Sequence, residues 1–98
     1  FIFDRPDRYT FWTKNTPLSL DMLWLNGQGI ITHIDRDVPA GTHSHWASRT
    51  SPNLAHFVIE LLAGTCDTFG IKTGHLTTVT ASVLALTMPP SIDVHSRP

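Results

Sequence analysis

The chain has 98 residues, a formal net charge of −1 and a hydrophobic share of 41%. This length fits one domain and leaves no room for a second. Seven basic residues against eight acidic ones provide no basic surface for nucleic acid. A single cysteine excludes an intramolecular disulfide and every zinc site that needs two thiolates. No apolar run approaches the roughly 18 residues of a membrane helix, so we expect no membrane insertion by this segment.

The first third of the chain contains two strand patterns. Aromatic and β-branched residues dominate residues 9–14, which predicts a strand that ends at the proline-containing turn 15–17. Residues 21–34 predict a β-hairpin, because two apolar runs flank the sequence Gly27-Gln28-Gly29. Glycines supply the positive φ angles that a tight hairpin turn demands.

The middle of the chain lacks a regular pattern. Residues 35–53 are rich in charge, proline, glycine, serine and histidine, which predicts a long loop. Loops of this length tend to be functional or mobile. Strand character returns at residues 54–61.

The last third predicts one helical turn and one strand. Residues 65–69 form the turn, with Gly70 as its stop. A last strand is expected over residues 76–86, although residues 81–88 would also suit a helix. Three prolines favour a disordered tail over residues 89–98, which leaves one domain over residues 1–88. Because strands dominate and short turns join neighbours, we predict an antiparallel all-β sandwich or barrel.

Histidine is abundant, with six copies, and metal binding is the first chemistry to consider. His43 and His45 form an H-x-H pair in the long loop, but a metal also needs a third and usually a fourth ligand. Further ligands would be available only if the fold brought them close: His33, His56, Asp35 and Asp37. We therefore predict solvated loop histidines and no metal site.

Nucleophilic catalysis and nucleotide binding also lack support. Cys66 has no signature context, and the neighbouring Asp67 disfavours the thiolate that a nucleophile needs. The chain has no G-x-S-x-G sequence, and none of its glycines forms a phosphate-binding loop between a strand and a helix. We predict no catalytic residue and no cofactor.

Several polar and aromatic residues stand in unusual surroundings. Trp12 lies in a strand, where core packing is the simplest role, whereas Trp46 lies in the polar loop and could pin it down or stack on a ligand. Lys14 and Glu60 are embedded in apolar strands, and Asp21 opens another. Each could point to solvent at a strand end. Because a buried charge must be matched, we expect instead that Lys14 pairs with Asp21 or Glu60.

Two stretches resemble a known family. The chain opens on F-I-F-D-R-P and continues with Y-T-F-W-T-K-N-T-P-L-S-L-D-M-L-W-L-N-G-Q-G. These strings resemble the domain of unknown function 192 family, also called uncharacterised protein family 0127. Thr13 and Ser19 depart from the family pattern, and the matching residues are Trp12, Lys14, Asn15, Thr16, Leu20, Asp21 and Met22. The runs I-E-L-L-A-G-T and G-I-K-T-G also match, but His75 stands where the family usually has aspartate.

The resemblance covers roughly residues 1–80. It implies an antiparallel β-sandwich or barrel found in bacteria and archaea, with no established activity. Family members carry an earlier portion with an R-G-L-M-like motif, so the resemblance implies that the domain is incomplete at its amino terminus. Family members are also often preceded by an export signal, which implies an exported, periplasmic or extracellular location.

Together these observations favour a small exported module that binds an unidentified ligand or protein without catalysis. Its predicted binding residues are Trp12, Lys14, Asn15, Asp21, Trp46 and Glu60. One alternative is an enzyme that uses Lys14, Asp21 and Glu60 in a pocket, and another is a purely structural domain. A concave site with converging polar groups would favour the enzyme, and a flat aromatic surface would favour a protein or glycan partner.

Overall fold

The computed structural model describes residues 1–75, 94 and 95. The strand predicted over residues 76–86, with its helical alternative, lies outside these residues. The described elements are β1 (Ile2–Asp7), β2 (Thr10–Trp12), β3 (Leu20–Leu25), β4 (Ile31–Val38), β5 (Ser48–Thr50), β6 (Ala55–Leu62), α1 (Thr65–Phe69) and β7 (Val94–His95). The predicted all-β antiparallel fold is confirmed, and its short helical turn lies at the expected position.

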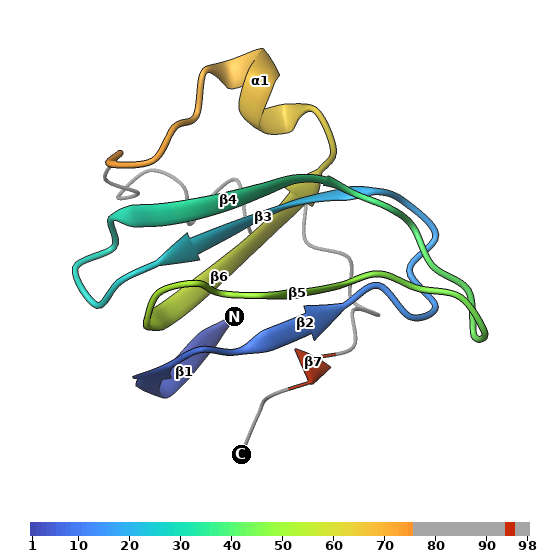
Figure 1. Cartoon of the computed structure of the whole chain (residues 1–98). Helices are drawn as coiled ribbons and strands as arrows, with labels where there is room; N and C mark the ends of the chain where they lie inside the picture. Colours follow the sequence, from blue (N-terminus) through green and yellow to red (C-terminus); the bar gives the residue numbers. More distant parts are fainter. Residues whose placement is uncertain (76–93, 96–98) are drawn as a thin grey trace.

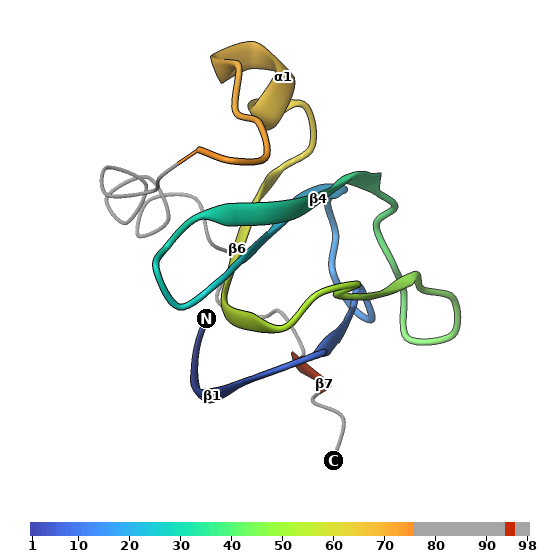
Figure 2. The same cartoon turned by 60° about the vertical axis from the view of Figure 1, so that its left-hand side comes forward.

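The strands form two antiparallel sheets. The larger sheet has the order β1-β6-β3-β4, and the smaller sheet has the order β5-β2-β7. The two sheets lie over one another as a sandwich, and α1 lies on the side of the larger sheet that faces away from the smaller one (Figures 1 and 2). Of the two predicted architectures, the structure is therefore a sandwich.

The hairpin predicted from residues 21–34 is confirmed as β3 and β4. The Asn26 side chain stabilises its turn, because its Oδ1 accepts the backbone N–H groups of Gln28 and Ile30 at 2.9 and 3.1 Å. Gly29 has a φ of 79°, the left-handed region that favours glycine. This one local sequence thus produces the central strand β3 of the larger sheet together with the edge strand β4.

Of the described strands, β1, β5 and the two-residue β7 were not predicted. β1 contains Pro6, and it is an edge strand of the larger sheet, where a residue without an N–H group is tolerated. β5 lies inside the segment predicted to be irregular, and β4 also extends into that segment as far as Val38. The prediction of an unstructured stretch over residues 35–53 is therefore wrong in part. Both β1 and β5 are fixed by pairing with distant strands rather than by their own sequence pattern.

Two apolar clusters cover the two faces of the larger sheet. The cluster between the sheets contains the edge-to-face pair Phe11 and Trp24, whose ring centroids lie 5.5 Å apart. The cluster on the opposite face joins the sheet to Cys66 of α1 and to Ile71. Gly70, with a φ of 63°, ends α1 as predicted.

Residues 94 and 95, in the tail predicted to be disordered, pair with β2 as strand β7. The other tail residues lie outside the described part of the chain. Within the described part, no helix is both long and apolar enough to cross a membrane.

Candidate functional site

The loop between β4 and β5 is tied to the end of β2 by hydrogen bonds. The backbone N–H of Thr13 donates to the Ala47 carbonyl oxygen at 2.9 Å, and the Ala47 N–H donates to Thr13 Oγ1 at 3.0 Å. Further along, the Asn15 N–H donates to the Thr42 carbonyl oxygen at 3.2 Å. The loop therefore holds a defined position beside β2.

Gly41 makes this close approach possible. A Cβ atom at this position would overlap the Thr13 carbonyl oxygen and lie 2.8 Å from the Cβ of Trp46. The Gly41 N–H also donates to the Thr16 carbonyl oxygen at 2.9 Å. A glycine at this position thus sets the place of Trp46.

Trp12, Lys14 and Trp46 form one group, which we call the tryptophan–lysine cluster. The two indole rings meet edge to face with centroids 5.7 Å apart. The Lys14 ammonium lies 5.1 Å from the Trp46 ring centroid and 5.8 Å from that of Trp12, within the range of cation–π attraction. Trp46 remains 40% exposed. The fold thus brings together three residues predicted to bind, two of which lie 34 positions apart in sequence.

No carboxylate neutralises Lys14 among the described residues. The ion pairs in this part of the structure join His33 to Asp35 and Arg36 to Asp67. Residues 8–20 and 38–59, which supply β2, β5 and the loop beside them, contain neither aspartate nor glutamate. The cluster therefore presents a positive charge on two described segments, residues 8–20 and 38–59, that contain no acidic residue.

Asp21 has a different role from the one predicted. This buried carboxylate accepts the backbone N–H of Asp37 at Oδ1 and that of Cys66 at Oδ2, each at 3.0 Å. It therefore fastens β3 to the end of β4 and to α1. The predicted pairing of Lys14 with Asp21 is wrong, because no ion pair joins the two side chains in the described part of the structure.

Glu60 is fully buried, and it does not pair with Lys14 in the described structure. It lies opposite Met22 on the face of the larger sheet that is turned to the smaller sheet. Neither of its oxygens has a hydrogen-bond partner among the described residues. Burial raises the pKa of Glu60 to about 8, although the Phe1 ammonium acts in the opposite direction.

The fold therefore does not bring the six predicted binding residues to one place. Asn15 directly follows Lys14 in the sequence, is exposed and has a φ of 58°. Asp21 points to the α1 side of the larger sheet, whereas Glu60 points between the sheets. The hypothesis of an enzyme that uses Lys14, Asp21 and Glu60 together requires a convergence that this geometry lacks.

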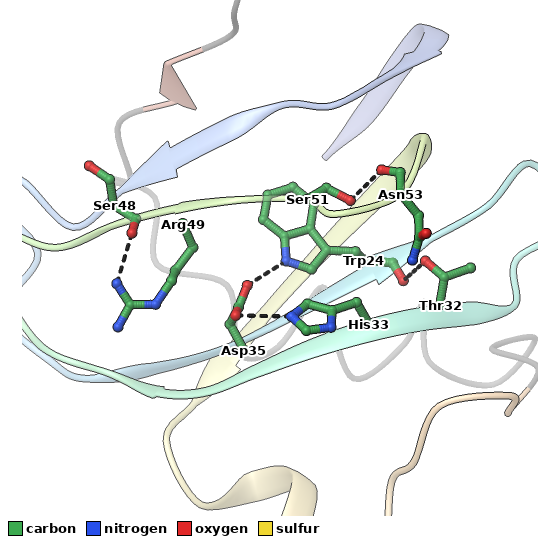
Figure 3. A network of polar contacts seen from close by, with 8 residues as sticks. All are labelled: Trp24, Thr32, His33, Asp35, Ser48, Arg49, Ser51 and Asn53. Atoms are coloured by element: carbon green, nitrogen blue, oxygen red, sulfur yellow. Dashed lines mark hydrogen bonds and ion pairs between the residues drawn. The ribbon is translucent and has the colours of Figure 1, made fainter.

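A second polar group was not recognised as a unit in the sequence. On β4, His33 Nε2 lies 3.1 Å from Asp35 Oδ1, and the buried Trp24 donates its indole N–H to Asp35 Oδ2 at 2.8 Å (Figure 3). From the sequence, His33 and Asp35 were candidates only as metal ligands. Their i, i+2 spacing on a strand places both side chains on one face and could have indicated the pair.

The remaining histidine and cysteine candidates lie apart from these groups. His43 and His45 are exposed in the loop, and His45 Nδ1 contacts Ser44 Oγ at 3.1 Å. In the described part of the chain, no three histidine, cysteine or acidic side chains gather as metal ligands. Burial, with the Asp21 carboxylate as the next cause, raises the pKa of the Cys66 thiol to about 12, which opposes thiolate formation.

The fold and the cluster define a class: a small two-sheet β-sandwich with an aromatic and basic surface group. The chain belongs to the family DUF192, described as an uncharacterized ACR (COG1430), whose model matches residues 1–79. The family resemblance drawn from the sequence is thereby confirmed. None of the curated proteins matches this chain.

Two solved bacterial structures are similar to the chain, each over 76% of its length and with a TM-score of 0.66. One, from Sinorhizobium meliloti, is 36% identical and is described as a candidate transcription regulator. The other, from Novosphingobium aromaticivorans, is 26% identical and is described as a protein of unknown function. The chain covers 55% and 51% of these two proteins, about half of each.

Proposed function

We propose that this domain is a non-catalytic binding module, and that its tryptophan–lysine cluster recognises an acidic segment of a partner protein. The observation that carries the proposal is the Lys14 ammonium held over two indole rings, without a carboxylate partner in the described structure. Tryptophan is enriched among the residues that dominate binding energy at interfaces. An acidic peptide would supply both a carboxylate for Lys14 and an apolar surface for Trp46.

The rigidity of the loop supports this proposal. Binding costs less free energy when the contact residues are ordered beforehand. Gly41 and the hydrogen bonds between Thr13 and Ala47 hold Trp46 beside Trp12 without any ligand. Asn15, the exposed residue after Lys14, adds an amide that can both donate and accept hydrogen bonds.

Nucleic acid is the competing partner, because aromatic rings with a nearby lysine also stack on bases. The S. meliloti relative is described as a candidate transcription regulator. The overall charge of −1 and a sequence pI of about 6.6 favour the acidic peptide, since nucleic-acid-binding domains are typically strongly basic.

The test is a titration of the full chain with a polyglutamate peptide, followed by tryptophan fluorescence. We expect saturable binding that weakens at least about tenfold in Trp46→Ala and in Lys14→Gln, since each removes a central contact worth over 1 kcal/mol. Lys72→Gln is the matched control, because Lys72 is an exposed lysine outside the cluster. Equal binding by Lys14→Gln and the parent chain, or tighter binding of oligothymidylate than of polyglutamate, would show the proposal to be wrong.

An exported or periplasmic location stays a prediction that rests on the family resemblance. Fractionation of cells that produce the natural full-length protein would check it, and a wholly cytosolic protein would contradict it.

A further inference from the structure

One edge of the smaller sheet is formed by the short strand β5. Its neighbour in the sheet is β2, and the strand lies at the end of the order β5-β2-β7. The two strands pair in an unbroken antiparallel register, which joins Thr10 to Thr50, Phe11 to Arg49 and Trp12 to Ser48. Backbone hydrogen bonds alternate along such a pair, so every second residue points its N–H and C=O away from the partner strand.

The backbone groups of Ser48 and Thr50 point away from β2. The hydrogen bonds that flank β5 fall on odd-numbered residues, from the Thr13 N–H to the Ala47 carbonyl oxygen at 2.9 Å and from the Ser51 N–H to the Tyr9 carbonyl oxygen at 3.1 Å. The even-numbered residues of β5 therefore direct their backbone groups to the other side. Because Ser48 and Thr50 are both exposed, this side of β5 is an open strand edge.

The Arg49 guanidinium lies at this open edge. Arg49 Nη1 donates to the Ser48 carbonyl oxygen at 2.7 Å, and that oxygen points away from β2 (Figure 3). Arg49 forms no ion pair with any described residue, so guanidinium donors remain for an anion. The Asp35 carboxylate of β4 contacts Trp24 and His33 instead.

The tryptophan–lysine cluster lies beside the same edge, on the outer face of the smaller sheet. Phe11 packs on Trp24 in the interior, so the next residue, Trp12, points outward. Trp46 contacts the Trp12 ring and directly precedes the segment that forms β5. The open edge of β5 therefore has Trp46 and the Lys14 ammonium on its outer face and the Arg49 guanidinium at the edge itself.

We propose that the acidic segment recognised by the tryptophan–lysine cluster binds as an added β-strand on the open edge of β5, an inference that rests on the proposed function. The backbone groups of Ser48 and Thr50 pair with the backbone of the added strand. Its side chains alternate between the two faces, so one acidic residue lies beside Trp46 and the Lys14 ammonium and the next lies beside Arg49. In strand addition, main-chain hydrogen bonds supply affinity and alternate side chains supply specificity.

The charges at the sheet edges select an acidic occupant and this edge. Residues 38–59 contain neither aspartate nor glutamate, so an acidic segment meets Lys14 and Arg49 without a competing carboxylate on β5. A second copy of the chain paired through β5 brings the same positive charges to both sides of the interface, which is unfavourable. The edge strand β4 carries Asp35 and Asp37, and the φ of 52° at Asp37 interrupts its extended backbone.

The experiment compares hexaglutamate with the same peptide N-methylated at every residue. The two peptides carry the same charge, but the second has no backbone N–H to donate to β5. Binding to the full chain is followed by tryptophan fluorescence. We expect N-methylation to weaken binding at least about fivefold, because hydrogen bonds are lost and methyl groups intrude at the edge. Equal affinity for the two peptides would overturn the added strand.

Thr50→Pro tests the same contact from the protein side, because proline lacks an N–H and is tolerated on an edge strand whose N–H points outward. Thr50→Val is its matched control, since it keeps the N–H and loses the hydroxyl that contacts Thr10. We expect Thr50→Pro and Arg49→Gln each to weaken hexaglutamate binding at least about fivefold. Thr50→Val should bind like the parent chain, and so should Arg36→Gln, which changes an exposed arginine paired with Asp67.

Amide hydrogen exchange of the parent chain gives a readout that needs no substitution. Saturating hexaglutamate should slow exchange of the Ser48 and Thr50 N–H groups at least about fivefold, whereas the Arg49 N–H, which points to β2, should change little. Unaltered exchange at both positions, or unaltered binding by a folded Thr50→Pro, would overturn the added strand. Binding that still depended on Lys14 and Trp46 would then leave the proposed function standing, and the absence of saturable hexaglutamate binding would overturn both.

Discussion

Asp21 in β3 accepts the backbone N–H of Cys66 in α1 at 3.0 Å, across 45 positions of sequence. The other oxygen of the same carboxylate accepts the N–H of Asp37, a residue with a φ of 52° at the far end of β4. One buried side chain therefore satisfies two backbone donors where the sheet meets the helix. Unsatisfied donors in such a place cost more than a typical hydrogen bond contributes.

Asp21→Asn should lower the free energy of unfolding by about 1–3 kcal/mol, because the amide offers one acceptor oxygen for two N–H groups. Urea denaturation measures this difference. Asp67→Asn is the matched control, since Asp67 forms an exposed pair with Arg36, and it should cost less than about 1 kcal/mol. Equal effects of the two substitutions would contradict the fastening role of Asp21.

Glu60 should make stability depend on pH. Burial raises its pKa from the ordinary 4.5 to about 8, so the folded chain keeps a proton that the unfolded chain releases between these values. The stabilisation is complete below the ordinary pKa and is lost as the pH rises through the folded value, at up to about 1.4 kcal/mol per pH unit.

The measurement is urea denaturation from about pH 5 to about pH 9, a range that covers most of the Glu60 shift. The isosteric Glu60→Gln lacks the titrating proton, so its stability relative to the parent chain should rise with pH. Contributions from groups that do not interact with Glu60 are shared by both chains and cancel in the comparison, whereas the Phe1 ammonium titrates together with Glu60. Parallel pH profiles would show that Glu60 ionises normally in the folded state.

Gly41→Ala should destabilise the chain by about 1–3 kcal/mol and shift the fluorescence of Trp46, because a new methyl group would press on Thr13 and on the indole stem. Gly27→Ala is the control, since its added methyl group would meet no atom within 4 Å. We expect the control to change stability by less than about 0.5 kcal/mol. A Gly41→Ala chain with unchanged stability would mean that the loop is not held against β2.

Lys14 and Trp46 should be coupled in a double-mutant cycle of Lys14→Met and Trp46→Leu. We expect a coupling free energy of about 0.5–1 kcal/mol, typical of an exposed cation–π contact. The corresponding cycle of Lys14→Met and Glu60→Gln should show coupling below about 0.5 kcal/mol, because the structure places these residues apart. A larger coupling free energy for Lys14 with Glu60 than for Lys14 with Trp46 would instead support the ion pair expected from the sequence.

Local sequence determined the parts of the fold that depend on near neighbours. The β3–β4 hairpin follows from two apolar runs around a turn with Asn26 and Gly29, and α1 ends where Gly70 adopts a positive φ. The strand over residues 54–61 was also predicted from its own composition, and β6 confirms it. Turn geometry and alternation act over a few residues, so they are visible in the sequence itself.

Tertiary structure decided everything that needed a partner from another part of the chain. β1 and β5 become strands by pairing with β6 and β2, and proline or polar composition concealed them in the sequence. The sequence suggested Trp12, Lys14 and Trp46 as binding residues, but only the contact between β2 and the loop placed them together. Conversely, Asp21 and Glu60 look alike in sequence, as acids in apolar strands. Their roles differ because Asp21 meets two backbone donors on the α1 side of the sheet, whereas Glu60 faces the apolar interior.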